Sequence, residues 1–162
     1  MPTCEQADIF EMFLSDPSVQ LAVVFGYLGF NELRQSWDAH RGGLQGLDQV
    51  SDPFLETQGN PIEAARGRWM MFIAAGENQG MTDKQIRESL SRACQWAVTR
   101  GLRQVATNGI RDCQHGPDTQ ANRVNDDQRA RFLGNYATEL EQEHNLRIRL
   151  ISRNDVFVRN AL

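Results

Sequence analysis

The order of apolar and polar residues along the chain predicts alternating strands and helices. Apolar runs predict strands at 20–25, 68–75, 102–107 and 147–152. Apolar residues at helical spacing predict helices at 5–14, 30–41, 82–100 and 125–144. A strand, a helix and a second strand in succession are typical of parallel βαβ units. The pattern therefore predicts an α/β fold with three α/β/α layers around a mixed, mostly parallel sheet.

Residues 68–108 form the clearest unit of this kind. Thr82 and Gln85 have the spacing of a capping box, and Gly101 supplies the left-handed residue that ends a helix. We expect the strands at 68–75 and 102–107 to lie side by side in the same direction, with the helix packed across them. The segments 54–57 and 62–65 predict either a hairpin that gives the sheet an antiparallel edge or a surface loop.

Length and composition indicate one ordinary globular domain, residues 1–162. The chain is 40% hydrophobic and 23% charged. No stretch approaches the roughly 20 apolar residues of a membrane span, and the first residues lack the features of a secretory signal, so we expect a cytoplasmic location. A formal charge of −4 argues against broad nucleic-acid binding.

The cysteines and arginines give no specific sign of chemistry. Cys94 falls on the apolar side of a predicted helix, where a core role is expected. Cys113 and His115 are neighbours in sequence, but they lack the further ligands of a metal site and the third group that orients a nucleophile. Arg147 and Arg149 alternate with apolar residues, which predicts the solvent side of an edge strand.

Small and polar residues follow the carboxyl ends of the strands that are expected to be parallel. Ligands bind at this edge in many α/β proteins, and glycines let backbone N–H groups approach a phosphate. No loop has the spacing of a dinucleotide or P-loop motif, which argues against a dehydrogenase or kinase and calls for no cofactor. The candidate ligand-binding residues are Gly26, Tyr27, Gly76, Asn108, Gly109, Ile110, Arg111, Asp112, Asp155 and Phe157.

From Arg68 onward, the chain resembles a macro domain. Two segments carry the resemblance: Gly-Leu-Arg-Gln-Val-Ala-Thr-Asn-Gly-Ile at 101–110 and Leu-Ile-Ser-Arg-Asn-Asp-Val-Phe at 150–157. The resemblance implies a macro-like fold that binds ADP-ribose or a related nucleotide, with hydrolysis of an ADP-ribosyl or phosphate bond if the protein is an enzyme. It also implies a phosphate loop at Gly109 and an aromatic stack at Phe157. The loop after Phe25 lacks the family's asparagine pair and triple glycine, so no catalytic residue is assigned.

The alternative is a non-enzymatic interaction or inhibitor domain on a degenerate α/β scaffold. It would offer Trp37, Trp69 or the region 44–67 to a protein partner, since aromatic residues are common interface anchors. The sequence leaves open which ligand is bound, whether a reaction is catalysed and which oligomeric state is formed.

Overall fold

A computed structural model describes residues 1–26, 62–65, 67–74, 83–108, 120–153, 158–159 and 161. Its centre is a six-stranded sheet in which β3 pairs antiparallel with β4 and every other neighbouring pair is parallel. The predicted mixed, mostly parallel sheet is therefore confirmed. The strand order is β1 (Thr3–Gln6), β6 (Arg147–Ser152), β5 (Gln104–Asn108), β2 (Leu21–Gly26), β4 (Arg68–Ala74) and β3 (Ile62–Ala65).

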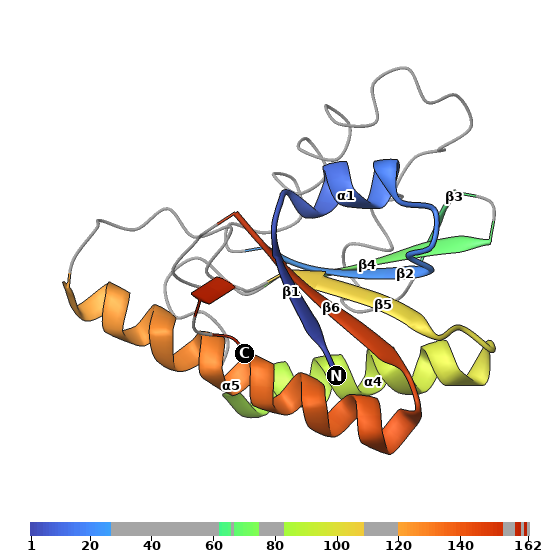
Figure 1. Cartoon of the computed structure of the whole chain (residues 1–162). Coiled ribbons are helices and arrows are strands. Elements are labelled where there is room, and N and C mark those ends of the chain that lie inside the picture. Colours follow the sequence, from blue (N-terminus) through green and yellow to red (C-terminus); the bar gives the residue numbers. More distant parts are fainter. Residues whose placement is uncertain are drawn as a thin grey trace.

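Helices cover both faces of the sheet, which confirms the three-layer α/β/α arrangement. Helix α1 (Ile9–Ser15) lies on one face, and α4 (Asp83–Thr99) and α5 (Gln120–His144) lie on the other (Figure 1). Alternate residues of the central strand β2 serve the two layers. Leu21, Val23 and Phe25 pack with residues of α4 and α5, whereas Ala22 and Val24 pack with α1.

The first segment of the chain differs from the expectation of a helix at 5–14. Residues Thr3–Gln6 form β1, an additional parallel strand beside β6, and the helix begins only at Ile9. The side chain of Asp8 accepts hydrogen bonds from the backbone N–H groups of Phe10 and Glu11 and so caps the helix. Pairing with β6 stabilises the extended conformation of these residues, although the spacing of the apolar residues at 5–14 is helical.

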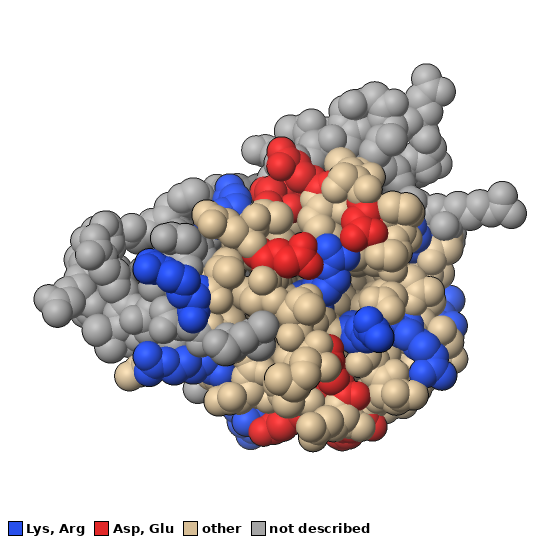
Figure 2. All heavy atoms as spheres, in the orientation of Figure 1, with Lys and Arg blue, Asp and Glu red and all other residues tan. Residues whose placement is uncertain are grey.

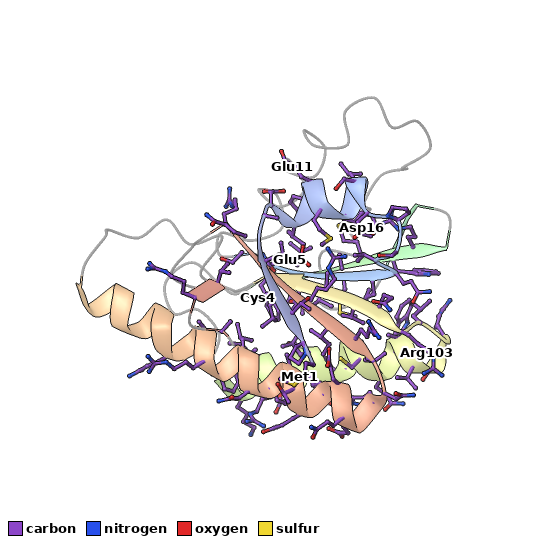
Figure 3. The ribbon with its side chains drawn as sticks, in the orientation of Figure 1. Met1, Cys4, Glu5, Glu11, Asp16 and Arg103 are labelled. Carbon is purple, nitrogen blue, oxygen red and sulfur yellow. The ribbon has the colours of Figure 1, made fainter. Side chains whose placement is uncertain are left out.

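The position of β6 also corrects a prediction. Because β1 lies outside it, β6 is an inner strand, not an edge strand. Its Arg149 is half-buried and forms a two-pronged ion pair with Glu5 on β1, with N–O distances of 2.7 and 2.9 Å. A third bond from the same guanidinium reaches Asp16 at 2.6 Å. Figure 3 labels both acids on the face of the sheet nearest the viewer, and Figure 2 shows acidic side chains flanking a basic one there.

The central βαβ unit is present, but its two strands are not adjacent. Strands β4 and β5 run in the same direction with α4 between them in sequence, and β2 lies between them in the sheet. A crossover helix can carry the chain past an intervening strand, so sequence order alone does not give neighbours. Gly101 has the predicted left-handed conformation, with φ of 74°, just after α4 ends.

Two further boundaries differ from the sequence prediction. Helix α5 begins at Gln120, so Asn125 lies inside the helix and is not its N-cap. Strand β3 supplies the predicted antiparallel edge, but its partner is β4, joined through the left-handed Gly67. The expected helix at 30–41, the segment 54–57, the cap at Thr82 and the pair Cys113 and His115 lie outside the described residues.

Among the helices that are described, none has both the length and the apolar character that a membrane span requires.

Candidate functional site

The sheet changes its winding direction between β2 and β5. After β2, the next strands of the chain, β3 and β4, lie on one side of it, whereas after β5 the next strand, β6, lies on the opposite side. Both strands point the same way, so their carboxyl ends meet at one edge of the sheet. In open α/β sheets, a crevice forms where neighbouring strands continue in opposite directions, and ligands bind there.

The backbone pairing of β2 with β5 also ends early. It runs from Leu21 opposite Val105 to Val23 opposite Thr107 and stops there. The outer pairings continue farther, to Gly26 on the β4 side and to Asn108 on the β6 side. The two central strands therefore separate at their carboxyl ends while each stays attached to its outer neighbour.

The side chain of Asn108 bridges the point of separation. Its Oδ1 accepts a hydrogen bond of 2.7 Å from the backbone N–H of Phe25, and its Nδ2 donates one of 3.0 Å to the Phe25 carbonyl. The amide thus takes the place of a strand residue and satisfies both backbone groups of Phe25. Asn108 is 1% exposed, so these bonds lie inside the protein, where unpaired polar groups are costly.

Thr107 reinforces the same junction. Its hydroxyl lies 2.9 Å from the Val23 carbonyl, at the last residue pair of the ladder, and donates to it. Thr107 thus adds a side-chain bond at the last regular pair, and Asn108 replaces the backbone pairing just beyond it. The pair is a local device that holds β2 and β5 at a fixed separation where the crevice begins.

The structure describes two of the predicted ligand-binding residues, Gly26 and Asn108. They end β2 and β5 respectively, so they occupy the carboxyl edges of the two strands that separate. In sequence, the other candidates follow β2, β4, β5 and β6 within a few residues of each strand end. Those outside the described residues are Tyr27, Gly76, Gly109, Ile110, Arg111, Asp112, Asp155 and Phe157.

The same edge carries polar groups that the sequence prediction did not include. Arg153 follows β6, and its Nε lies 4.0 Å from Oδ2 of Asp8, which follows β1. Gln6 donates a hydrogen bond from Nε2 to the Arg153 carbonyl at 3.3 Å. Because β1 was not anticipated, neither Asp8 nor Gln6 was placed at this edge. Cys4 is the only apolar residue of β1, so no alternation of apolar and polar residues marks this strand in the sequence.

The two described cysteines are not activated nucleophiles, and the described residues form no metal centre. Burial raises the pKa of the Cys94 thiol to about 12, and burial beside Glu5 raises that of Cys4 to about 11, so both remain protonated at neutral pH. Cys94 is buried among the residues of α4 and the sheet, as predicted. No cluster of three acidic, histidine or cysteine side chains suited to a metal ion occurs in the part of the chain that is described.

Trp69, named above as a surface for a protein partner, is half-buried. Its ring makes an edge contact with Trp96, with centroids 5.1 Å apart, and both rings pack against the hydrophobic core. The guanidinium of Arg100 lies 4.8 Å from the centre of each ring. Packing between β4 and α4 accounts for this tryptophan.

Comparison with known proteins finds similarity among solved structures but not among sequences. No protein-family model matches the sequence, and no curated protein matches it either. Among solved structures, the macrodomain of Thermus aquaticus DarG is similar, with a TM-score of 0.48 and 10% sequence identity over 95% of this chain and 99% of that chain. A likeness of this degree is no basis for assigning a shared ligand.

Proposed function

We propose that this protein binds a small phosphorylated ligand of the ADP-ribose class at the carboxyl edge of its sheet, where β2 and β5 separate. The observation that supports this most is the junction at Asn108, because it coincides with the change of winding direction. Both features are expected of a crevice that receives a ligand.

The residues next along the chain suit a phosphate. Gly109, Ile110 and Arg111 follow Asn108 directly, and a glycine lets backbone N–H groups approach the oxygens of a phosphate. Arg111 would add a charged donor, as guanidinium groups commonly do for phosphate. In this proposal Asn108 is a positioning residue, because its own amide is already bonded to Phe25.

The ligand class comes from the sequence resemblance of 101–110 and 150–157 to a macro domain. On that basis the adenine base stacks on Phe157 or Tyr27. Hydrolysis of an ADP-ribosyl or phosphate bond is part of the resemblance, and we assign no residue to it. A protein that binds without hydrolysing fits the same geometry.

Calorimetric titration with ADP-ribose, AMP and NAD tests the proposal. We expect saturable binding of at least ADP-ribose by the unaltered chain and its loss in Gly109→Glu, which places a carboxylate in the expected phosphate loop. Gln95→Glu adds the same charge at an exposed position of α4 and should bind as the unaltered chain does. Absence of heat with all three ligands would remove the nucleotide proposal and favour the interaction domain.

A further inference from the structure

A second hollow opens at the amino edge of the sheet, opposite the edge discussed above. Its volume is about 470 Å³. It lies between the start of the chain, the starts of β5 and β6, and the last turn of α5. The residues that line it are Met1, Arg103, Gln104, Glu141, Gln142, Asn145, Leu146 and Arg147.

Two arginines line this hollow: Arg103 directly precedes β5, and Arg147 is the first residue of β6. The backbone N–H of Arg147 donates to the Arg103 carbonyl at 2.8 Å, and Gln104 lies in register with Arg147. Their backbones are therefore held roughly 5 Å apart, the spacing of paired strands. Both residues are exposed, and neither guanidinium has an ion pair with a described residue. Figure 2 shows basic side chains gathered in the region where Figure 3 labels Arg103.

The carboxylate of Glu141, which also lines the hollow, already has partners within the protein. One oxygen of Glu141 accepts a hydrogen bond of 2.7 Å from the backbone N–H of Ile148, and the other lies 3.1 Å from the Met1 ammonium group. Its charge is thus balanced without either arginine. The amides of Gln104 and Gln142 complete a lining rich in donors.

An adjoining hollow of about 260 Å³ shares Arg103, Asn145 and Leu146 with the first and is also lined by His144. The His144 side chain is 10% exposed, and its Nε2 has no hydrogen-bond partner among the described residues. The nearest carboxylate oxygen recorded for it, on Glu143, is 3.9 Å away. A buried ring nitrogen without a partner calls for a hydrogen-bond partner from outside the protein or for water.

We infer that the amino-edge hollow binds a pyrophosphate group, held by Arg103 and Arg147 together. Both arginines line the same hollow, so an anion of more than one charge bound there can accept hydrogen bonds from both guanidinium groups. The site is at the opposite edge from the proposed ADP-ribose crevice and does not depend on it. Free pyrophosphate and the diphosphate of a nucleotide share this chemistry.

Amide chemical shifts of the full chain, recorded at constant ionic strength, test the inference with inorganic pyrophosphate and with ADP as separate titrants. We expect saturable shifts at 101–104 and 145–147 with pyrophosphate. Shifts there with ADP as well would identify a nucleotide as a source of the group, and shifts with pyrophosphate alone would identify the free ion. Either result supports the site.

Three variants complete the test. Replacing both Arg103 and Arg147 by glutamine should weaken pyrophosphate binding at least about tenfold. Arg92→Gln removes one exposed charge from the middle of α4 and should leave the affinity within about twofold. The inference is overturned if no saturable shift occurs at the amino edge, or if Arg92→Gln weakens binding as much as the double variant does. The inference is also overturned if the double variant lowers the stability of the protein but leaves pyrophosphate binding unchanged. The arginines would then act by stabilising the carboxyl ends of α4 and α5.

Discussion

The side-chain amide of Asn108 forms hydrogen bonds with both backbone groups of Phe25, at 2.7 and 3.0 Å, just beyond the last regular pair of β2 and β5. A strand residue normally makes such a pair of bonds through its own backbone. The side chain therefore lets the two strands part without leaving Phe25 unsatisfied. This relationship links the sheet topology to the proposed crevice, because it fixes the place and the width of the separation.

Replacing Asn108 by alanine should destabilise the protein. Both bonds to Phe25 are lost, and the N–H and carbonyl of a residue that is 1% exposed are left without partners. We expect the free energy of unfolding to fall by about 3 kcal/mol. Urea denaturation measures this loss, and Asn135→Ala at an exposed position of α5 is the matched control, expected to change stability little.

Asn108→Asp separates shape from hydrogen bonding. The carboxylate can accept the bond from the Phe25 N–H, but it cannot donate to the Phe25 carbonyl. The variant should therefore lose at least about 1 kcal/mol. Stability equal to that of the unaltered chain would contradict the role given to the Nδ2 group.

Gly134 on α5 allows the end of the chain to pack directly on the helix backbone. A Cβ at this position would lie 1.4 Å from the carbonyl oxygen of Ala161. Gly134→Ala should therefore expel the segment around Ala161 and destabilise the protein by about 1 to 3 kcal/mol. Loss of amide exchange protection at Ala161, together with urea denaturation, measures both effects.

The effect of Gly134→Ala on stability should change sign when the segment around Ala161 is removed. In a chain shortened to end at residue 157, alanine at position 134 meets no carbonyl from Ala161. It should then stabilise α5 by up to about 1 kcal/mol, because alanine favours helix over glycine. Equal destabilisation of the full and shortened chains would show that the clash with Ala161 is not the cause.

Acid should weaken the link between α1 and the sheet through Asp16. Hydrogen bonds from Ser18 and then from Arg149 lower the pKa of Asp16 from 3.8 to about 2. A lowered pKa in the folded state stabilises the protein above pH 4, and this contribution is lost as the pH falls from about 4 to about 2. The carboxylate is 36% exposed, so solvent limits the effect to less than about 1 kcal/mol.

Asp16→Asn tests this pH dependence. Unfolding free energies at pH 5 and pH 2.5 should differ less in the variant than in the unaltered chain, and Ser18→Ala should reduce the difference in part. An unchanged difference in Asp16→Asn would assign the acid sensitivity to other groups.

Arg68 ties the end of α1 to the start of β4. Its guanidinium donates to the carbonyls of Val19 and Asp16 at 2.9 Å each and to that of Phe13, and it lies 4.0 Å above the Phe13 ring. Arg68→Met should lower the free energy of unfolding by about 2 to 3 kcal/mol. Arg68→Lys keeps the charge but not the planar fork, so it should recover less than half of the loss in urea denaturation. Full recovery by lysine would contradict the account.

Much of the fold could be predicted because it rests on local patterns. The apolar run that ends at Phe25 predicts a buried central strand, and Gly101 marks the end of α4. Strand β1 could not be found in this way, since it is only four residues long and its stability comes from pairing with β6. The insertion of β2 between β4 and β5 is a property of the whole sheet that no local pattern contains.

The candidate site, like the fold, could be predicted from the sequence only in part. The carboxyl edge was predictable from strand direction, and Gly26 and Asn108 do end the two strands that separate there. The bonding of Asn108 to Phe25 was not predictable, because the residues are 83 positions apart and the contact depends on the strand order. The amino-edge pair of Arg103 and Arg147 escaped notice for the same reason.

The most direct test of the central claim is an amide chemical-shift titration of the full chain with ADP-ribose. We predict saturable shifts at Phe25, Gly26 and Asn108, and we expect them to remain in the variant in which Arg103 and Arg147 are both replaced by glutamine. An absence of saturable shifts, or shifts confined to the amino edge of the sheet, would contradict the claim that the junction of β2 and β5 is where the ligand binds.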